Sequence, residues 1–132
     1  MFGRLRWLAG KIPKFRMFDL ADIFLFGVLI AALSVPFVFG VIPRNRFYGF
    51  RVPATLQDDE VWYVMNRRVA FEMIGLGIVL AASATTANQL ELGAGVRTTL
   101  TVLMFAGLAA ITVRHWVVAN RFRDGKRTQR TA

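Results

Sequence analysis

The sequence predicts an all-α membrane protein: a three-transmembrane-helix bundle with an N-terminal amphipathic interfacial helix and a folded loop between helices one and two. Residues 23–42 contain no charged residue, and their number matches the roughly 20 that a helix needs to cross a hydrocarbon core of about 30 Å. The chain of 132 residues is 55% hydrophobic with a mean hydropathy of +0.46, which is more apolar than soluble domains usually are. A soluble three-helix bundle would need polar stripes at helical spacing, and these runs have none.

The first 18 residues have an amphipathic pattern. Apolar residues recur every three or four positions, at Phe2, Leu5, Leu8, Ile12 and Phe15. Pro13 ends or kinks a helix near this point, so we expect a short interfacial helix in residues 1–18 that acts as a lipid anchor or, alternatively, docks on a neighbouring protein. The basic residues that we expect among anionic headgroups are Arg4, Arg6, Lys11, Lys14 and Arg16.

A membrane domain is predicted for residues 19–120, with a basic tail at 121–132 and spans at about 20–42, 68–88 and 98–119. The first apolar run starts well inside the chain and is longer than the h-region of a signal peptide, so we expect it to remain in the mature protein. Small residues at near-helical spacing would let the spans approach closely. They are Gly27, Ala31, Gly75, Gly77, Ala81, Ala106, Gly107 and Ala110.

Glu72 is the polar interruption of the second span. An ionisable group about one turn inside a span is costly and normally faces protein or water. Its candidate partners are Arg68 at i−4, an arginine of the loop or one from another chain; alternatively, the carboxylate reaches back to the interface. We expect Arg114 and His115 to lie at the interface end of the third span.

The loop at residues 43–67 is dense in polar and aromatic residues. Pro43 ends the first helix, Gly49 permits a turn with positive φ and Pro53 holds Val52 extended, so residues 43–54 should form a compact turn. A helix then resumes. We expect a capping signature at Thr55 and Asp58, and acidic residues in the first turn of this helix: Asp58, Asp59 and Glu60. We also expect Arg51 to pair with one of these acidic groups and Trp62 to pack under the turn.

The order of residue types in this loop resembles the signature of the SdpI family of bacterial integral membrane proteins. The residues that carry the resemblance are Asn45, Tyr48, Gly49, Arg51, Pro53, Thr55, Leu56, Asp59, Glu60, Trp62 and Asn66. The resemblance implies a three-helix unit with this loop as its recognition element. The family's namesake is an immunity protein that also holds a transcriptional repressor at the membrane, so the resemblance implies toxin immunity or membrane signalling through protein contact and not catalysis.

The composition argues against other classes. The chain has no cysteine and one histidine, so neither a thiolate nor a histidine metal site is expected, and no catalytic residue or cofactor is predicted. The net charge of +9 comes from basic residues that flank apolar runs, which indicates anionic lipid and no nucleic acid. We expect the bacterial inner membrane and one or more integral membrane proteins as partners. The alternative is an accessory or structural subunit of a larger complex, such as a respiratory or photosynthetic assembly.

The basic residues also bear on orientation. An odd number of spans places the two basic termini on opposite sides, so the positive-inside rule cannot satisfy both. The segment from Arg44 to Arg68 and the tail together hold ten of the 17 lysines and arginines. We therefore expect loop and tail in the cytoplasm and the N-terminal helix outside, whereas dominance of the N-terminal cluster would give the reverse.

Overall fold

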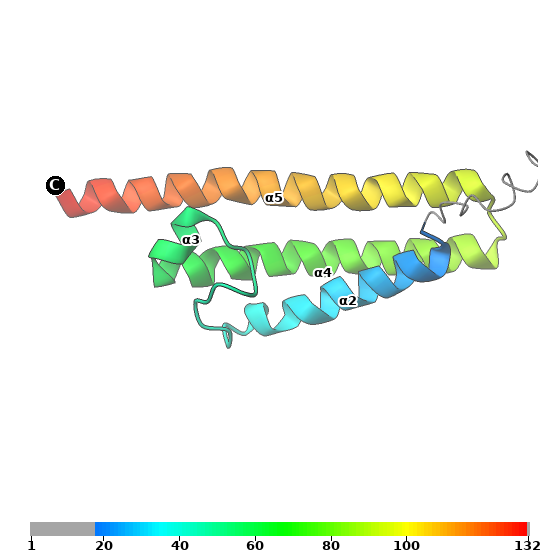
Figure 1. Cartoon of the computed structure of the whole chain (residues 1–132), viewed down its shortest axis with the longest axis horizontal. Coiled ribbons are helices and arrows are strands. Elements are labelled where there is room, and N and C mark those ends of the chain that lie inside the picture. Colours follow the sequence, from blue (N-terminus) through cyan, green and yellow to red (C-terminus); the bar gives the residue numbers. More distant parts are fainter. Residues whose placement is uncertain (1–17, 132) are drawn as a thin grey trace, which may run out of the picture.

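The computed structural model describes residues 18–131, and the predicted interfacial helix therefore lies outside the described residues. Within this range the chain forms four helices (Figure 1). They are α2 (Leu20–Val38), α3 (Pro53–Gln57), α4 (Asp59–Gln89) and α5 (Ala94–Thr131). The all-α prediction is confirmed for this part of the chain.

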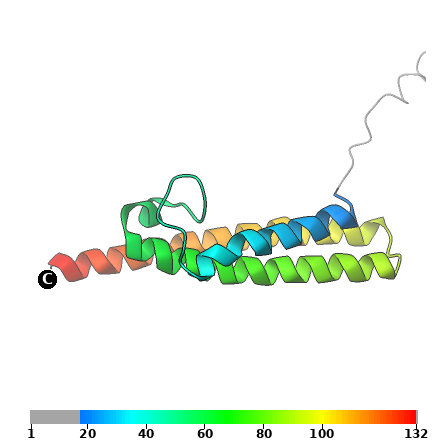
Figure 2. The ribbon, with the colours of Figure 1, turned by 90° about the horizontal axis from the view of Figure 1, so that it is seen from below.

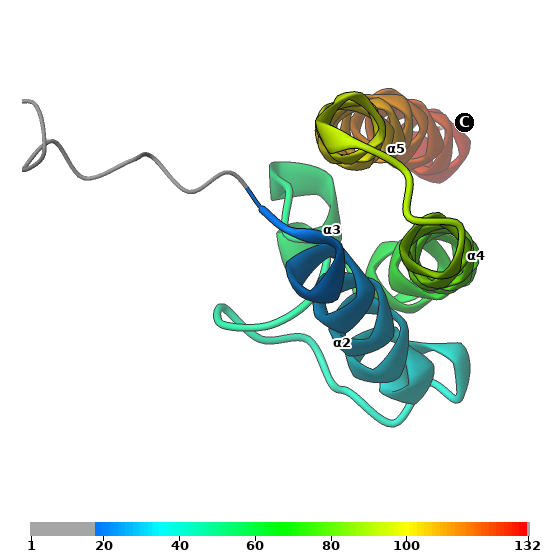
Figure 3. The same ribbon diagram turned by 90° about the vertical axis from the view of Figure 1, so that its right-hand side faces the viewer.

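The long α4 helix lies between the other two long helices (Figure 1). Both α2 and α5 pack along α4 but contact each other little. The view from the end of the bundle shows α2 and α5 apart, with α4 touching both (Figure 3). The loop between α2 and α4 lies at the same end of the bundle as the C-terminus (Figure 2).

The first span begins and ends at recognisable signals. Asp19 accepts a hydrogen bond from the backbone of Asp22, and Asp22 accepts one from the backbone of Asp19, so the two form a capping box. After Pro36 the helix ends at Val38, and Gly40 takes a positive φ of 66°. A residue in this left-handed conformation commonly terminates a helix because it brings the last carbonyls back to donors.

Three buried clusters hold the helices together. Ile23 of α2 packs with residues of α4 and α5 in the cluster Ile23, Leu80, Ala84 and Met104. At the loop end, α3 and α5 meet α4 in the cluster Ala54, Val61, Met65 and Ala119. Beside it, the end of α2 packs on α4 through Phe37, Trp62 and Ala70. Two of the three clusters therefore support the loop.

Three boundaries differ from the sequence prediction. The first span ends at Val38 and not near residue 42, before Pro43 is reached. The residues from 59 to 67 are the first turns of α4 and not loop, because α4 runs without a break from the acidic residues into the span. The basic residues from 121 onward continue α5 as far as Thr131. The predicted tail is thus an extension of the third helix.

Three of the helices, α2, α4 and α5, are long and apolar enough to cross a membrane. Many of their large apolar side chains point away from the bundle, such as Leu29 at 57%, Ile78 at 60% and Val102 at 60% exposure. In water such surfaces would be unfavourable, but hydrocarbon chains cover them without loss. The predicted three-span bundle is confirmed.

Candidate functional site

The tip of the loop is held by its own asparagine. Asn45 Oδ1 accepts hydrogen bonds from the backbone N–H groups of Phe47 and Tyr48, both at 2.8 Å, and its amide donates to the carbonyl of Pro43. An asparagine side chain that caps nearby backbone groups in this way fixes a turn without help from secondary structure. The loop tip therefore has a defined conformation.

A second asparagine ties the loop to α4. Asn66 is buried and accepts a hydrogen bond of 2.6 Å from the backbone of Phe50, while its amide donates to the carbonyl of Trp62. Gly49 passes directly over it with φ of 107°, as predicted. A Cβ at Gly49 would lie 2.6 Å from Asn66 Oδ1 and 2.8 Å from the Phe37 ring. Glycine is therefore required here for both conformation and space.

Aromatic side chains fill the space beneath the turn. Trp62 is fully buried, as expected, and its indole Nε1 donates to the carbonyl of Ile42 at 3.0 Å. The Phe37 ring lies 4.7 Å from that of Tyr48 and 6.4 Å from that of Trp62, centroid to centroid. The Tyr48 hydroxyl donates to the carbonyl of Leu33. These contacts fasten the loop to the end of α2.

The capping prediction for Thr55 and Asp58 needs correction. Thr55 lies inside the short helix α3, fully buried, where its hydroxyl accepts from the backbone of Val52 and donates to the carbonyl of Phe50. Asp58 alone caps α4, by accepting from the backbone of Val61 at 3.1 Å. Pro53 at the start of α3 inserts this extra turn, which the spacing of the two residues does not reveal.

The predicted pair between Arg51 and an acidic group is wrong. Arg51 Nη1 donates to the carbonyl of Arg46. It is Arg44 that lies 2.7 Å from Asp59 Oδ1, with a second bond from its guanidinium to the carbonyl of Leu56.

The remaining acidic residues of the triplet pair with the far end of α5. Lys126 Nζ lies 2.9 Å from Asp58 Oδ2 and 2.6 Å from Glu60 Oε2. The hydrogen bond from Lys126, together with that from the Val61 backbone, lowers the pKa of Asp58 below its ordinary value. These pairs fasten the extension of α5 to the start of α4.

Glu72 finds its partner on the third span. Arg114 Nη1 lies 2.7 Å from Glu72 Oε1, and His115 Nε2 lies 3.1 Å from Glu72 Oε2 without the alignment of a hydrogen bond. The His115 side chain is only 3% exposed and meets the Phe50 ring edge-on, so it faces protein, and its position at the interface end of the third span stays a prediction. Arg114 is largely exposed but pairs across the bundle. Neither Arg68 nor a loop arginine makes this contact.

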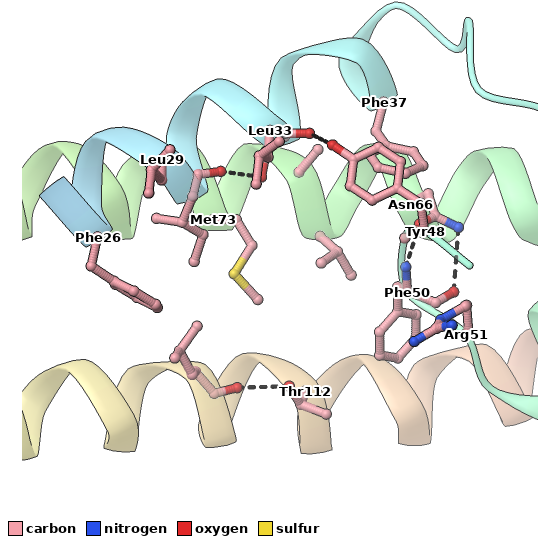
Figure 4. A pocket seen from close by; sticks show the side chains of 16 residues that line it. Phe26, Leu29, Leu33, Phe37, Tyr48, Phe50, Arg51, Asn66, Met73 and Thr112 are labelled. Atoms are coloured by element: carbon pink, nitrogen blue, oxygen red, sulfur yellow. Dashed lines mark hydrogen bonds between the residues drawn. The ribbon is translucent and has the colours of Figure 1, made fainter. Parts of the chain in front are cut away.

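A cavity of about 630 Å³ lies between α2 and α5 at this end of the bundle. Figure 4 shows Phe26 towards one end of its wall and Arg51 at the other, with Met73 between them. Most of the lining is apolar. The loop forms one end of the cavity through Tyr48, Gly49 and Phe50.

The structure gathers most of the predicted signature residues into one network. Asn45, Tyr48, Gly49, Thr55, Trp62 and Asn66 all hold the loop fold, while Asp59 and Glu60 point outward into ion pairs. Pairing between the acidic triplet and the arginines Arg44, Arg46 and Arg51 was the favoured explanation of these charges, and Arg44 makes such a pair. Sequence reasoning missed two further basic residues that hold this region: Arg67, which donates to the carbonyl of Val38, and Lys126. The only sequence signal for these basic residues was the excess of positive charge near the acidic residues Asp58, Asp59 and Glu60. Among the described residues, no group of three His, Asp or Glu side chains could hold a metal.

Three membrane-spanning helices with a loop folded against their common end define a multi-pass membrane protein. The chain belongs to the SdpI/YfhL protein family, whose sequence model matches residues 41–114. This range contains the whole loop and the Glu72–Arg114 pair. Comparisons with curated proteins and with solved structures gave no match.

Proposed function

We propose that this protein is non-enzymatic and acts by binding another integral membrane protein in the bacterial inner membrane, with the loop as its recognition element. The observation that carries this proposal is the position of Phe47, which is 90% exposed. Its backbone is held by Asn45. A large aromatic side chain presented on a rigid loop binds with little loss of conformational entropy, which is typical of interface hot spots.

The charges of the loop support contact over catalysis. Asp58, Asp59 and Glu60 are the acidic groups that a headgroup or phosphate enzyme could use with a divalent cation. Each is engaged by a cationic side chain of the same chain. Their arrangement stabilises the loop and the end of α5.

Within its family, the closest functional hypothesis for the chain is toxin immunity or membrane signalling. Both activities require recognition of a second polypeptide at the membrane. The signature residues hold the loop conformation, so we propose that they preserve the shape of the binding surface, and that exposed residues such as Phe47 decide which partner binds.

The test is co-purification after cross-linking. A photoreactive amino acid placed at Phe47 should give a discrete cross-linked product in cells, which mass spectrometry identifies. Phe47→Ala should remove the partner from affinity-purified protein, whereas the control Phe71→Ala should not, since Phe71 is also exposed, at 58%, but lies on the span of α4. Equal recovery of all partners with both variants would contradict the proposal.

A second candidate is an accessory subunit of a larger assembly. It is favoured by the extension of α5, which runs beyond the start of α4 and carries basic residues (Figure 1). Such a helix would offer neighbouring subunits of a large complex a contact surface outside the membrane. Purification in mild detergent distinguishes the two, because a subunit migrates stoichiometrically with a large complex and an immunity-type protein does not.

A further inference from the structure

The cavity between α2 and α5 is a lateral groove. Its floor is α4, at Val69, Ala70 and Met73, and its two walls are Phe26 and other residues of α2 and Leu108 of α5. α2 and α5 contact each other little, and Figure 3 shows the two helices apart. The groove lies between them, with residues of both helices and of α4 in its lining. In a membrane this opening meets the hydrocarbon chains of lipids.

The polar groups of the groove are almost all in use. The hydroxyls of Ser34, Tyr48 and Thr112 donate to backbone carbonyls, and Asn66 bonds the loop (Figure 4). Arg51 is the exception, since the structure shows one hydrogen bond for it, from Nη1 to a carbonyl. A guanidinium has five N–H donors. The groove therefore offers one cation with spare donors at the end of an apolar surface.

Arg51 lies at the level where the first span ends. Its neighbour Phe50 is bonded to Asn66, and the next residue of α4, Arg67, donates to the carbonyl of Val38, the last residue of α2. The apolar part of the groove then extends along α2 as far as Phe26, towards the middle of the membrane. This is the geometry of a headgroup above an acyl chain.

We propose that this groove binds one anionic membrane lipid, with its phosphate on Arg51 and an acyl chain along α2. Arginine binds phosphate bidentately, so its spare donors suit this group. Arg46 belongs to the same loop and adds positive charge at this end, which is complementary to an anionic headgroup; Arg44 is already paired with Asp59. This lipid site is separate from the protein contact assigned to Phe47, and either can fail alone.

A lipid fits the groove better than a helix from a partner. Helices associate in membranes where small residues let their backbones approach. The two walls of the groove, on α2 and α5, carry bulky side chains: Phe26, Leu29, Leu33 and Leu108. The small residues that allow close approach, Gly27 and Gly77, already face each other between α2 and α4. Flexible hydrocarbon chains fill an uneven apolar wall without such a requirement.

The test is lipid retention by the whole protein. Purified protein in a neutral detergent is titrated with phosphatidylglycerol or with phosphatidylcholine carrying the same chains, and native mass spectrometry counts the bound lipids. We expect one tightly bound phosphatidylglycerol. Arg51→Gln should weaken it about tenfold, the loss expected for a hydrogen-bonded charge. The matched control is Arg68→Gln, an exposed arginine outside the groove, which should leave binding unchanged.

The acyl chain is tested separately. Leu108→Trp should fill the groove and reduce phosphatidylglycerol binding while Arg51 stays in place. Val102→Trp, on an exposed position of the same helix outside the groove, is its control. If Arg51→Gln does not fold, as judged by circular dichroism, Arg51→Lys and Leu108→Trp still decide the question. Arg51→Lys keeps the charge but loses the bidentate donors of the guanidinium, so this variant should bind phosphatidylglycerol more weakly than the native protein does.

Three results would overturn the proposal. Equal retention of the two lipids would show that the headgroup is not recognised. Glycerol phosphate binding as tightly as phosphatidylglycerol would show a free phosphate site without an acyl-chain contribution. A photoreactive amino acid at Met73 that cross-links in cells to a polypeptide and not to lipid would show that a protein occupies the groove.

Discussion

Gly27 of α2 and Gly77 of α4 face each other where the two helices cross. A Cβ built on Gly77 would lie 2.4 Å from the carbonyl oxygen of Gly27, and one on Gly27 would lie 2.5 Å from that of Gly77. The backbones are therefore in contact at this point. Gly75, only two residues away, has open space around it.

This difference predicts opposite effects for two neighbouring substitutions. Gly77→Ala should force α2 and α4 apart and destabilise the protein by about 1–3 kcal/mol, as overpacking of an interior contact does. Gly75→Ala should be neutral or slightly stabilising, because alanine favours the helix over glycine by roughly 0.5–1 kcal/mol. Thermal unfolding in detergent compares the two variants. Equal destabilisation by both would show that the crossing is elsewhere.

Gly49→Ala should disrupt the loop while the three spans stay intact. The methyl group would clash with Asn66 Oδ1 and the Phe37 ring, and alanine is strained at a φ of 107°. Limited proteolysis should therefore cut the variant within residues 43–54 much faster than the native protein. Gly40→Ala is the control: it also has positive φ, but the nearest atom to its Cβ is 3.9 Å away. Similar cleavage of both variants would indicate that backbone strain, and not the clash with Asn66 and Phe37, disrupts the loop.

The Glu72–Arg114 pair should contribute through hydrogen bonding. Glu72→Gln keeps an acceptor for Arg114 and should lower the melting temperature less than Glu72→Leu, which leaves Arg114 without its acceptor and His115 beside an apolar group. A double-mutant cycle with Arg114→Gln should give a coupling of about 0.6 kcal/mol, the average for polar pairs between membrane helices. Equal tolerance of Gln and Leu at this position would contradict a hydrogen-bonding role.

The contact between Asp58 and Lys126 should depend on pH. The pKa of Asp58 is lowered in the folded protein by Lys126 and the Val61 N–H, so the stabilisation is complete above the ordinary carboxyl pKa of about 4 and is lost as the pH falls through the lowered value. The melting temperature should be higher for the native protein than for Lys126→Met at pH 7, and the difference should shrink below pH 4. A difference that is independent of pH would assign the effect to packing of the lysine stem.

The loop and the extension of α5 should lie on the same side of the membrane, and we expect that side to be the cytoplasm because residues 44–68 and the extension hold ten of the 17 basic residues. Single cysteines at Ala9, Gln57 and Thr128 test this in a chain without cysteine. A membrane-impermeant reagent applied to intact cells should label Ala9→Cys and spare the other two. Labelling of Gln57→Cys with protection of Ala9→Cys would reverse the orientation.

Local sequence signals predicted much of the loop. Glycine permits positive φ and the residues around it can form a turn, so the positive φ at Gly49 and the burial of Trp62 under the turn were predictable. The end of the first helix was predicted at Pro43 and lies earlier, at Val38. The family signature was also readable, because it depends on residue types at fixed spacing. The local signals restrict the loop backbone, and contacts to α2 and α4, such as those of Asn66 and Trp62, complete the loop conformation.

The partners of the charged residues were not predictable. Arg44 and Arg51 have the same side chain and lie near the same acidic triplet in sequence, yet only Arg44 reaches it. Lys126 reaches Asp58 from 68 residues away. Such pairs depend on which way the backbone turns and on where α5 lies.

The sequence by itself determined the three spans, because a hydrocarbon core selects for uncharged runs of a given length whatever the neighbouring helices do. It also determined the folded loop, through local restrictions on the backbone. Only the tertiary structure decided that α2 and α5 pack on α4 and scarcely on each other, that His115 is buried beside Glu72, and that Arg51 borders a groove. The physical reason is that apolar spans can pack against lipid or against one another with similar free energy, so side-chain fit in three dimensions selects the arrangement.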